Sequence, residues 1–370
     1  MFFEIYVSFF FHVRTLKLTQ IILPLPTMTL NKNILVTGGA GFIGSHTVIK
    51  LIELGFSPYI LDDFRNSERK VIDRIEKLTG VKPPVFSIDI SDKDLLNNKL
   101  KGIQFAGVIH FAAYKAVGES VAEPLKYYRN NILGLLNIVE FCEENNILNL
   151  VFSSSCTVYG EPENEKCVSE DANTKNPNSP YGFTKVVGEQ LLRDVHQSGA
   201  KLKALSLRYF NPIGAHPSGL IGELPIGKPN NLIPYVTQTG AGILEKLTIY
   251  GHDYPTEDGT CKRDYIHVCD LADAHLKGLD FLMNRNKPLI EFVNVGTGEG
   301  TSTLEVVKIF ERISGKKLNW VYGPRRDGDV AEIFSSSERS LSLLGWKAEL
   351  NTEDAIKDAW NWQLKQNDEV

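Results

Sequence analysis

A glycine-rich turn between an apolar run and a helical pattern is the feature that most constrains this fold. Residues 34–37 read ILVT, residues 38–44 read GGAGFIG, and residues 46–54 (HTVIKLIEL) repeat apolar side chains at helical spacing before Gly55. Residues 58–62 (PYILD) form a second apolar run that ends in an acid. This order of strand, turn, helix and strand is typical of a dinucleotide-binding unit.

Three glycines of this turn are the candidate phosphate-binding residues. Gly38 can take the tight turn, Gly41 lets a pyrophosphate approach backbone N–H groups, and Gly44 lets the helix lie close to its strand. Asp62 follows 18 residues after Gly44. A carboxylate there can accept both ribose hydroxyls and would repel a 2′-phosphate. We therefore expect NAD rather than NADP, while the nearby Arg65 leaves NADP open.

Strand and helix patterns continue to alternate after the second strand. This alternation predicts an α/β fold, a Rossmann-like doubly wound parallel sheet with a smaller mixed α/β substrate-binding domain. We predict an NAD-binding domain over 31–210, to which the chain returns near 264–275, and a second, substrate-binding domain over 211–370. The further predicted strands are 85–89, 106–113, 148–155 and 202–211, with helices at 133–144 and at 300–315, the latter capped by Thr301 or Ser302.

A serine, a tyrosine and a lysine gather near the predicted carboxyl edge of this sheet, where ligands bind in such folds. Ser155 ends one strand, and SPYGFTK (179–185) opens the next helix. Tyr181 and Lys185 are four residues apart and therefore share one helix face. We expect the lysine charge, aided by a nicotinamide, to lower the pKa of the phenol. The three residues are the candidate proton-transfer group.

Composition narrows the classes of partner and compartment. A net charge of −5 and a pI near 6.0 give no broad basic field, so nucleic acid is not expected as a partner. The five cysteines include no C-x-x-C and do not predict a zinc site. They suit free thiols in a reducing compartment.

The first residues differ from the rest. MFFEIYVSFFF is too short and broken to span a bilayer, and Arg14 and Lys17 follow the apolar run instead of preceding it as in a signal peptide. We expect residues 1–30 to be an extension outside the fold, with Met28 as an alternative start. A weak membrane-anchoring or targeting role stays open, but no stable membrane association is expected.

The chain resembles extended short-chain dehydrogenases/reductases, and within them the UDP-glucose 4-epimerases (UDP-galactose 4-epimerases). The resemblance runs in order from about Asn33 to about Gln363, and the later stretches are more specific than the glycine turn. The matching stretches are ILVTGGAGFIGSHT, VIHFAAYKAVGESV, SSSCTVYG, SPYGFTK, LRYFNPIGAHPSG, PNNLIPY, YGHDYPTEDGTCKRDYIHV and PRRDGDV.

This resemblance implies an NAD-dependent isomerase of galactose metabolism. The sugar would be oxidised at C4 to a 4-keto intermediate, rotate, and be reduced on its opposite face, with Tyr181 taking and returning the 4-hydroxyl proton. UDP-galactose and UDP-glucose are the implied substrates, and NAD is implied to stay bound. Relatives are often homodimers, so a cytoplasmic homodimer is expected.

The resemblance also implies the residues of the site. The implied catalytic residues are Tyr181, Lys185 and Ser155. The implied cofactor contacts are Gly38, Gly41, Phe42, Ile43, Gly44, Asp62, Asp89, Ile90, Phe111, Lys115, Asn130, Ser155, Tyr181, Lys185 and Phe210. The implied substrate contacts are Ser155, Tyr181, Asn211, Asn231, Arg263, Arg326 and Asp329.

Two departures and several alternatives accompany this interpretation. Cys156 stands where close relatives usually have alanine, and Ile333 leaves activity on UDP-N-acetylhexosamines open. Cys156 and Thr157 lack the acid that sugar-nucleotide dehydratases need beside the serine, which argues against dehydration. A UDP-glucuronate epimerase or decarboxylase is a weaker alternative. A non-enzymatic NAD-binding regulator would be expected to lose one of the three proton-transfer residues, and a partner-binding role for the C-terminal half is disfavoured by its polar loops.

Overall fold

The structure is a computed structural model that describes residues 31–161, 166–174, 177–326 and 329–368. The predicted extension at 1–30 lies outside these residues. From residue 31 onward the chain forms one compact unit. Within the described ranges, none of the helices combines the length and apolar character needed to cross a bilayer.

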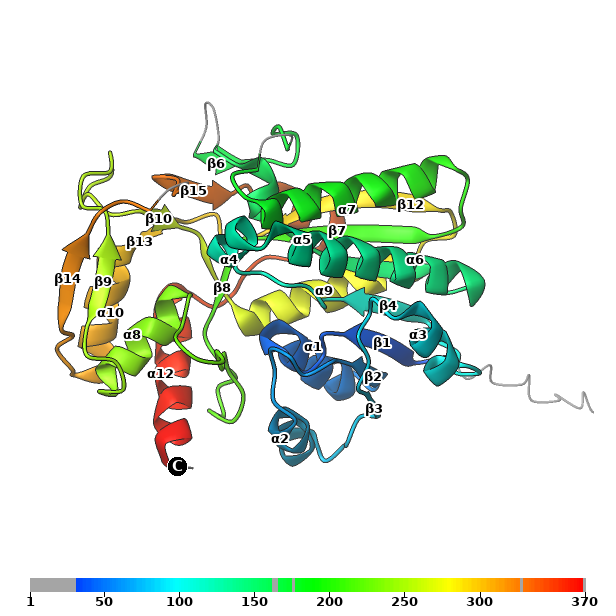
Figure 1. The fold of residues 1–370 in the computed structure, drawn as a ribbon, viewed down its shortest axis with the longest axis horizontal. Helices are drawn as coiled ribbons and strands as arrows, with labels where there is room; N and C mark the ends of the chain where they lie inside the picture. The colour runs from blue at the N-terminus through cyan, green and yellow to red at the C-terminus, as the bar shows by residue number, and fades with distance from the viewer. Residues whose placement is uncertain (1–30, 162–165, 175–176, 327–328, 369–370) are drawn as a thin grey trace, which may run out of the picture. The chain divides into compact units, whose positions relative to one another are not determined.

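A seven-stranded parallel sheet forms the larger part of this unit (Figure 1). Its order is β12-β7-β5-β4-β1-β2-β3, and each neighbouring pair is parallel. This confirms the predicted Rossmann-like sheet, whose strand order reverses at β1. The strands are β1 (Asn33–Thr37), β2 (Ser57–Leu61), β3 (Val85–Phe86), β4 (Gly107–His110), β5 (Asn149–Ser155), β7 (Lys203–Tyr209) and β12 (Leu289–Val295).

Helices cover both faces of the sheet, which explains why its strands are continuous apolar runs. In β1, Ile34 and Val36 face one core and Leu35 faces the other, as the period of two requires. The helices of the first core are α1 (Phe42–Glu53), α2 (Lys70–Thr79) and α9 (Val268–Met283). The helices of the second are α3 (Lys93–Leu100), α6 (Gly134–Glu144) and α7 (Pro180–Gln197).

Three of the differences between the observed and the predicted elements are the following. Helix α1 begins at Phe42, inside the glycine-rich stretch, because Gly41 is already its N-cap. Strand β3 ends at Phe86, and three residues later the Asp89 carboxylate accepts the N–H and hydroxyl of Ser91 in a local turn. The edge strand at 289–295 was not predicted, although the predicted return at 264–275 reaches the start of α9.

Shorter elements follow β7 and form a mixed α/β region. A core that includes Val236, Phe310 and Trp360 holds α8, α10 and α12 together. Helix α10 carries a complete capping box on Ser302, so the predicted cap is confirmed. The division into domains at 31–210 and 211–370 stays a prediction. The remaining bounds are β6 (Cys167–Val168), β8 (Asn211–Ile213), α8 (Leu232–Gly240), β9 (Leu247–Tyr250), β10 (Lys262–Arg263), β11 (Tyr265–His267), β13 (Thr301–Ser302), α10 (Thr303–Ser314), β14 (Trp320–Gly323), β15 (Glu332–Ser335), α11 (Glu338–Leu344) and α12 (Thr352–Asp368).

Short helical segments complete this part of the fold. They lie between β4 and α6 and directly after β5 (Figure 1). Their bounds are α4 (Val117–Ala122), α5 (Pro124–Tyr127), a π-helical turn (Tyr128–Leu133) and a 3₁₀ turn (Cys156–Tyr159).

Candidate active site

The glycine turn after β1 has the shape needed to hold a diphosphate. Gly38 has a φ of 68°, and a Cβ there would lie 2.8 Å from the Ala112 backbone nitrogen. A Cβ at Gly44 would overlap the Gly38 carbonyl oxygen. Helix α1 has no side-chain cap at Gly41, so its first N–H groups are not used by a capping side chain. These features fit the phosphates of a dinucleotide at a helix N-terminus.

Asp62 is anchored beside this turn at the end of β2. It is buried, and its carboxylate accepts the Ala40 N–H at 3.0 Å, the Phe64 N–H at 2.9 Å and the Ser67 hydroxyl at 2.8 Å. Burial raises its pKa, and these hydrogen bonds act in the opposite direction. The carboxylate is therefore held in place at the end of β2, and its contact with a ribose stays a prediction.

The half-exposed Arg65 side chain pairs with two carboxylates. Its guanidinium bonds Asp89, and its Nε lies 3.4 Å from Asp63. Hydrogen bonds with Tyr114 and Asp89 raise the pKa of Arg65. Burial alone would raise the pKa of Asp89, but hydrogen bonds from Ser91 and Arg65 lower it. The positive charge of Arg65 is thus balanced by these carboxylates, which makes Arg65 less suited to bind a 2′-phosphate.

Phe111 and Phe210 lie along the same edge, because the strands that precede them are parallel. Phe111 N–H bonds the Thr37 carbonyl at 3.0 Å, which joins the ends of β4 and β1. Ser155 is opposite Tyr209 in register, which brings Phe210 next to the end of β5. Phe42, Ile43 and Asn130 are half-buried and Ile90 is buried.

Ser155, Tyr181 and Lys185 meet at this edge and are all buried. Ser179 caps α7 by accepting the Gly182 N–H at 3.2 Å, which places Tyr181 in the first turn. Ser155 accepts the Thr157 N–H at 3.2 Å and is a hydrogen-bond partner of the Tyr181 hydroxyl. The structure therefore brings the three residues together, and their role in proton transfer stays a prediction.

Burial opposes the lowered tyrosine pKa that the sequence led us to expect. The Lys185 ammonium donates to the Ser153 carbonyl at 2.7 Å and lies 5.9 Å from the Tyr181 ring centroid. Burial raises the pKa of Tyr181 to about 12 and lowers that of Lys185 to about 7. Desolvation thus outweighs the hydrogen bond from Ser155 and the attraction of Glu189, and a further positive charge is needed to favour the phenolate.

Sequence reasoning missed the polar residues behind the catalytic strand. The Glu189 carboxylate accepts hydrogen bonds from Arg208 Nε and Nη2 and from the Ser154 hydroxyl at 2.7–2.8 Å. The Tyr209 hydroxyl bonds Ser153. Arginine inside the apolar run LKALSLRYFN was the available signal, because a buried charge requires a partner.

The substrate candidates come from the mixed region. Arg263 in β10 lies 3.6 Å from Asp329, so these two come together. Asn211 is paired with β11, and its N–H bonds the Asp264 carbonyl at 3.0 Å. The exposed Arg326 lies over Tyr250, with its guanidinium 3.9 Å from the ring centroid.

Glu223 joins the two sides of the site and was not predicted. Its carboxylate accepts from Lys115 at 3.1 Å and from Asn231 at 2.5 Å. Lys115 is a cofactor candidate and Asn231 a substrate candidate. The sequence signal was an acid in the polar loop GELPIG between Asn211 and Asn231.

Ile333 is buried against predicted site residues. It lies opposite Arg263 in the β10–β15 register and packs in a cluster with Phe210, Val158 and Tyr159. Its side chain therefore borders the residues proposed to hold the cofactor and the sugar.

Comparisons with known proteins agree with this geometry. The model of the NAD dependent epimerase/dehydratase family matches residues 34–296. UDP-glucose 4-epimerase 2 of Arabidopsis thaliana is 48% identical over 334 residues, which cover 90% of this chain and 95% of that protein. The bifunctional protein GAL10 of Pachysolen tannophilus is 48% identical over 336 residues, 90% of this chain, which spans 49% of that longer protein.

A solved structure extends the similarity to the fold. The UDP-glucose-4-epimerase of Stenotrophomonas maltophila, crystallised with bound NAD and formylated UDP-arabinopyranose, has a TM-score of 0.88 and 43% identity over 92% of this chain and 100% of its own. Because the family model spans most of the described fold and the relatives align over nine-tenths of the sequence, the chain belongs to the NAD dependent epimerase/dehydratase family.

Proposed function

We propose that this chain interconverts UDP-galactose and UDP-glucose by inverting C4 of the sugar, with NAD as its cofactor. The observation that carries the proposal is the buried group of Ser155, Tyr181 and Lys185 beside a diphosphate-shaped glycine turn. Its similarity to UDP-glucose 4-epimerases over nine-tenths of the chain supports the substrate.

The chain's own residues supply binding and proton transfer. We assign the cofactor to the glycine turn, Asp62 and the residues named along the sheet edge. When bound, NAD would accept a hydride from C4 and return it, and its nicotinamide would add a positive charge to the site. The Tyr181 oxygen takes the 4-hydroxyl proton and later returns it, Ser155 orients that hydroxyl, and the Lys185 charge favours the phenolate. The reaction ends without net oxidation.

Diphosphate and ribose contacts fit the mixed region. Arg263 and Arg326 suit the UDP diphosphate because a guanidinium is a permanent cation with several donors. Asp329 suits a ribose hydroxyl, and Asn211 and Asn231 supply further polar contacts.

We propose a cytoplasmic homodimer. The buried thiols of Cys142 and Cys261 suit a reducing compartment. Exposed apolar side chains gather on α4, α5, α6 and α7, and such a face favours an interface with a second copy. These side chains are Val117, Val121, Leu125, Leu136 and Phe183.

The test follows UDP-galactose by proton NMR with purified protein and no added NAD. We expect an equilibrium mixture with UDP-glucose from the wild type and none from Tyr181→Phe. Reaction of UDP-glucuronate alone would contradict the substrate assignment. If no UDP-sugar reacts even with NAD added, a non-enzymatic NAD-binding protein is favoured.

A further inference from the structure

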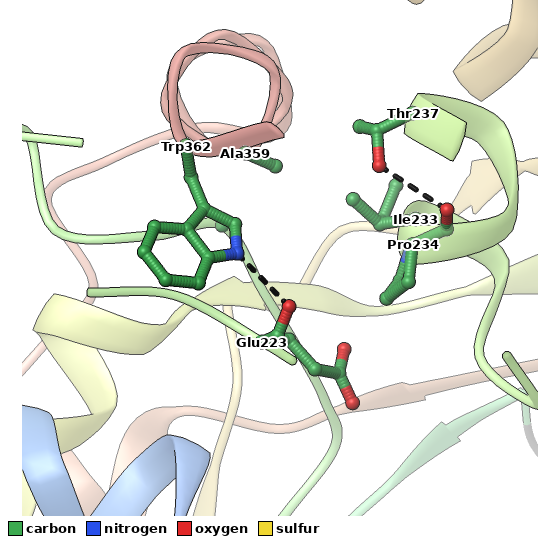
Figure 2. Close-up of a pocket in the computed structure, with 7 residues that line it drawn as sticks. Glu223, Ile233, Pro234, Thr237, Ala359 and Trp362 are labelled. Atoms are coloured by element: carbon green, nitrogen blue, oxygen red, sulfur yellow. Dashed lines mark hydrogen bonds between the residues drawn. The ribbon is translucent and has the colours of Figure 1, made fainter. Parts of the chain in front are cut away.

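Glu223 lies in the loop between β8 and α8, and the last helix, α12, contacts its backbone. Its backbone carbonyl accepts the indole N–H of the buried Trp362, on α12, at 3.0 Å. Figure 2 shows the carbonyl facing the indole nitrogen and the carboxylate directed away from it. A cavity of about 10 Å³, lined also by Ile233 and Thr237, lies beside this residue. The backbone of Glu223 is therefore tied to α12 by a hydrogen bond.

One oxygen of Glu223 joins two side chains from distant parts of the chain. Its Oε1 accepts from the Lys115 ammonium at 3.1 Å and from the Asn231 amide at 2.5 Å. The Glu223 side chain is 12% exposed, whereas that of Lys115 is 45% exposed. A fixed carboxylate thus restrains a long, otherwise mobile lysine.

Asn231 contacts Glu223 and does not cap its own helix with its side chain. It is the N-cap residue of α8, where an asparagine oxygen usually accepts an N–H of the first turn, yet it makes no such bond. Its amide is instead directed at Glu223. The hydrogen bond to Glu223, and not a capping bond, therefore orients the Asn231 side chain.

We propose that Glu223 is a positioning residue that fixes Lys115 on the cofactor side and Asn231 on the UDP side of one site. This inference rests on the proposed function, because it assigns the two partners to NAD and to UDP. A carboxylate beside two diphosphates also repels them, which opposes the positioning effect. The direction of the change on removing its charge separates the two.

The decisive variant is Glu223→Gln, which keeps the size and one acceptor oxygen. Loss of a charged hydrogen-bond partner predicts about a tenfold rise in the UDP dissociation constant and in KM for UDP-galactose, with kcat within about twofold. NAD should also be lost faster during gel filtration. Tighter UDP binding, or values within about twofold of wild type, would overturn the proposal.

Glu311→Gln is the matched control. Glu311 likewise accepts from a lysine, Lys317, at 2.8 Å and from a second donor, the Leu318 N–H, at 3.0 Å, and its side chain is 15% exposed. It lies on α10, and its change should leave UDP binding, NAD retention and KM as in the wild type. If both glutamine variants weaken UDP binding equally, the effect is general to the fold and the proposal fails.

A second background tests the division of labour. With Lys115→Met, the extra NAD loss caused by Glu223→Gln should disappear, while its effect on UDP binding through Asn231 persists. Equal NAD loss in both backgrounds would contradict the assignment. Calorimetry of UDP and retention of NAD need no turnover. If UDP-galactose is not converted but these readouts still separate Glu223→Gln from Glu311→Gln, the reaction assignment fails and the positioning role stands.

Discussion

Glu189 and Arg208 form a buried ion pair behind the strand that carries Ser155. The Arg208 Nη2 and Glu189 Oε2 atoms are 2.7 Å apart, and the two side chains are 1% and 3% exposed. The second Glu189 oxygen accepts Arg208 Nε and the Ser154 hydroxyl. Helix α7, which carries Tyr181, is thereby tied to β5 and β7.

Breaking this pair should be costly, because either partner alone is an uncompensated buried charge. We expect Glu189→Gln to lower the free energy of unfolding by about 3–5 kcal/mol, measured by urea denaturation. Glu353→Gln is the control, since its partner Arg312 is 64% exposed and this surface pair should contribute little. A loss at Glu189 no larger than at Glu353 would contradict the buried-charge argument.

Lys185 should make stability depend on pH in a defined direction. Its pKa is lowered from 10.5 to about 7, so between these values the unfolded chain binds a proton that the folded chain does not. Stability then rises with pH in that window. Lys185→Met removes this dependence, so the free energy of the variant minus that of wild type should fall by about 2 kcal/mol from pH 7 to pH 9.

The comparison uses cofactor-free protein at both pH values, and other titrating groups cancel. The bond from the ammonium to the Ser153 carbonyl is lost at both, so only the difference in slope is diagnostic. Parallel stability profiles for wild type and variant would show that the lysine titrates normally. The variant should be inactive throughout, since the charge that favours the phenolate is gone.

Asp62 should set the preference for NAD. Asp62→Asn removes a charge that would accept the ribose hydroxyls and repel a 2′-phosphate, so NAD affinity should fall about 10- to 100-fold. The preference for NAD over NADP, measured as the ratio of their dissociation constants, should fall by a larger factor than the NAD affinity itself. Both dissociation constants are measured by calorimetry on stripped protein. Asp63→Asn is the control, and an equal loss there would mean that general charge, not the Asp62 position, decides.

Ile333 should limit the size of the sugar's 2-substituent. It is buried beside Phe210, and Ile333→Ala removes three carbons from that cluster. We expect the ratio of kcat/KM for UDP-N-acetylglucosamine over UDP-glucose to rise roughly tenfold, and unfolding to become easier by about 2–5 kcal/mol. Ile333→Tyr should lower the same ratio. If the ratio is unchanged in both variants, Ile333 does not line the sugar pocket.

The sequence was sufficient where local pattern and topology act together. Apolar runs, the turn after β1 and the Tyr181–Lys185 spacing predicted the sheet and its ligand-binding edge, because parallel strands deliver their carboxyl ends to one place. It was insufficient where the partner is distant in the chain. Glu189 with Arg208, and Glu223 with Lys115, pair only after folding. The pKa directions at Tyr181 and Lys185 depend on burial, which spacing does not reveal.

The apolar face over α4–α7 should hold two copies together. Leu125 and Val121 are 75% and 63% exposed there, which is unusual for side chains of their size in a cluster. Leu125→Glu places a charge in such an interface, so light scattering should show the mass of one chain where the wild type shows two. Leu54→Glu is the control, because Leu54 is 61% exposed at the end of α1, outside this face. If the Leu125 variant keeps the wild-type mass at low micromolar concentration, the second copy does not bind through this face.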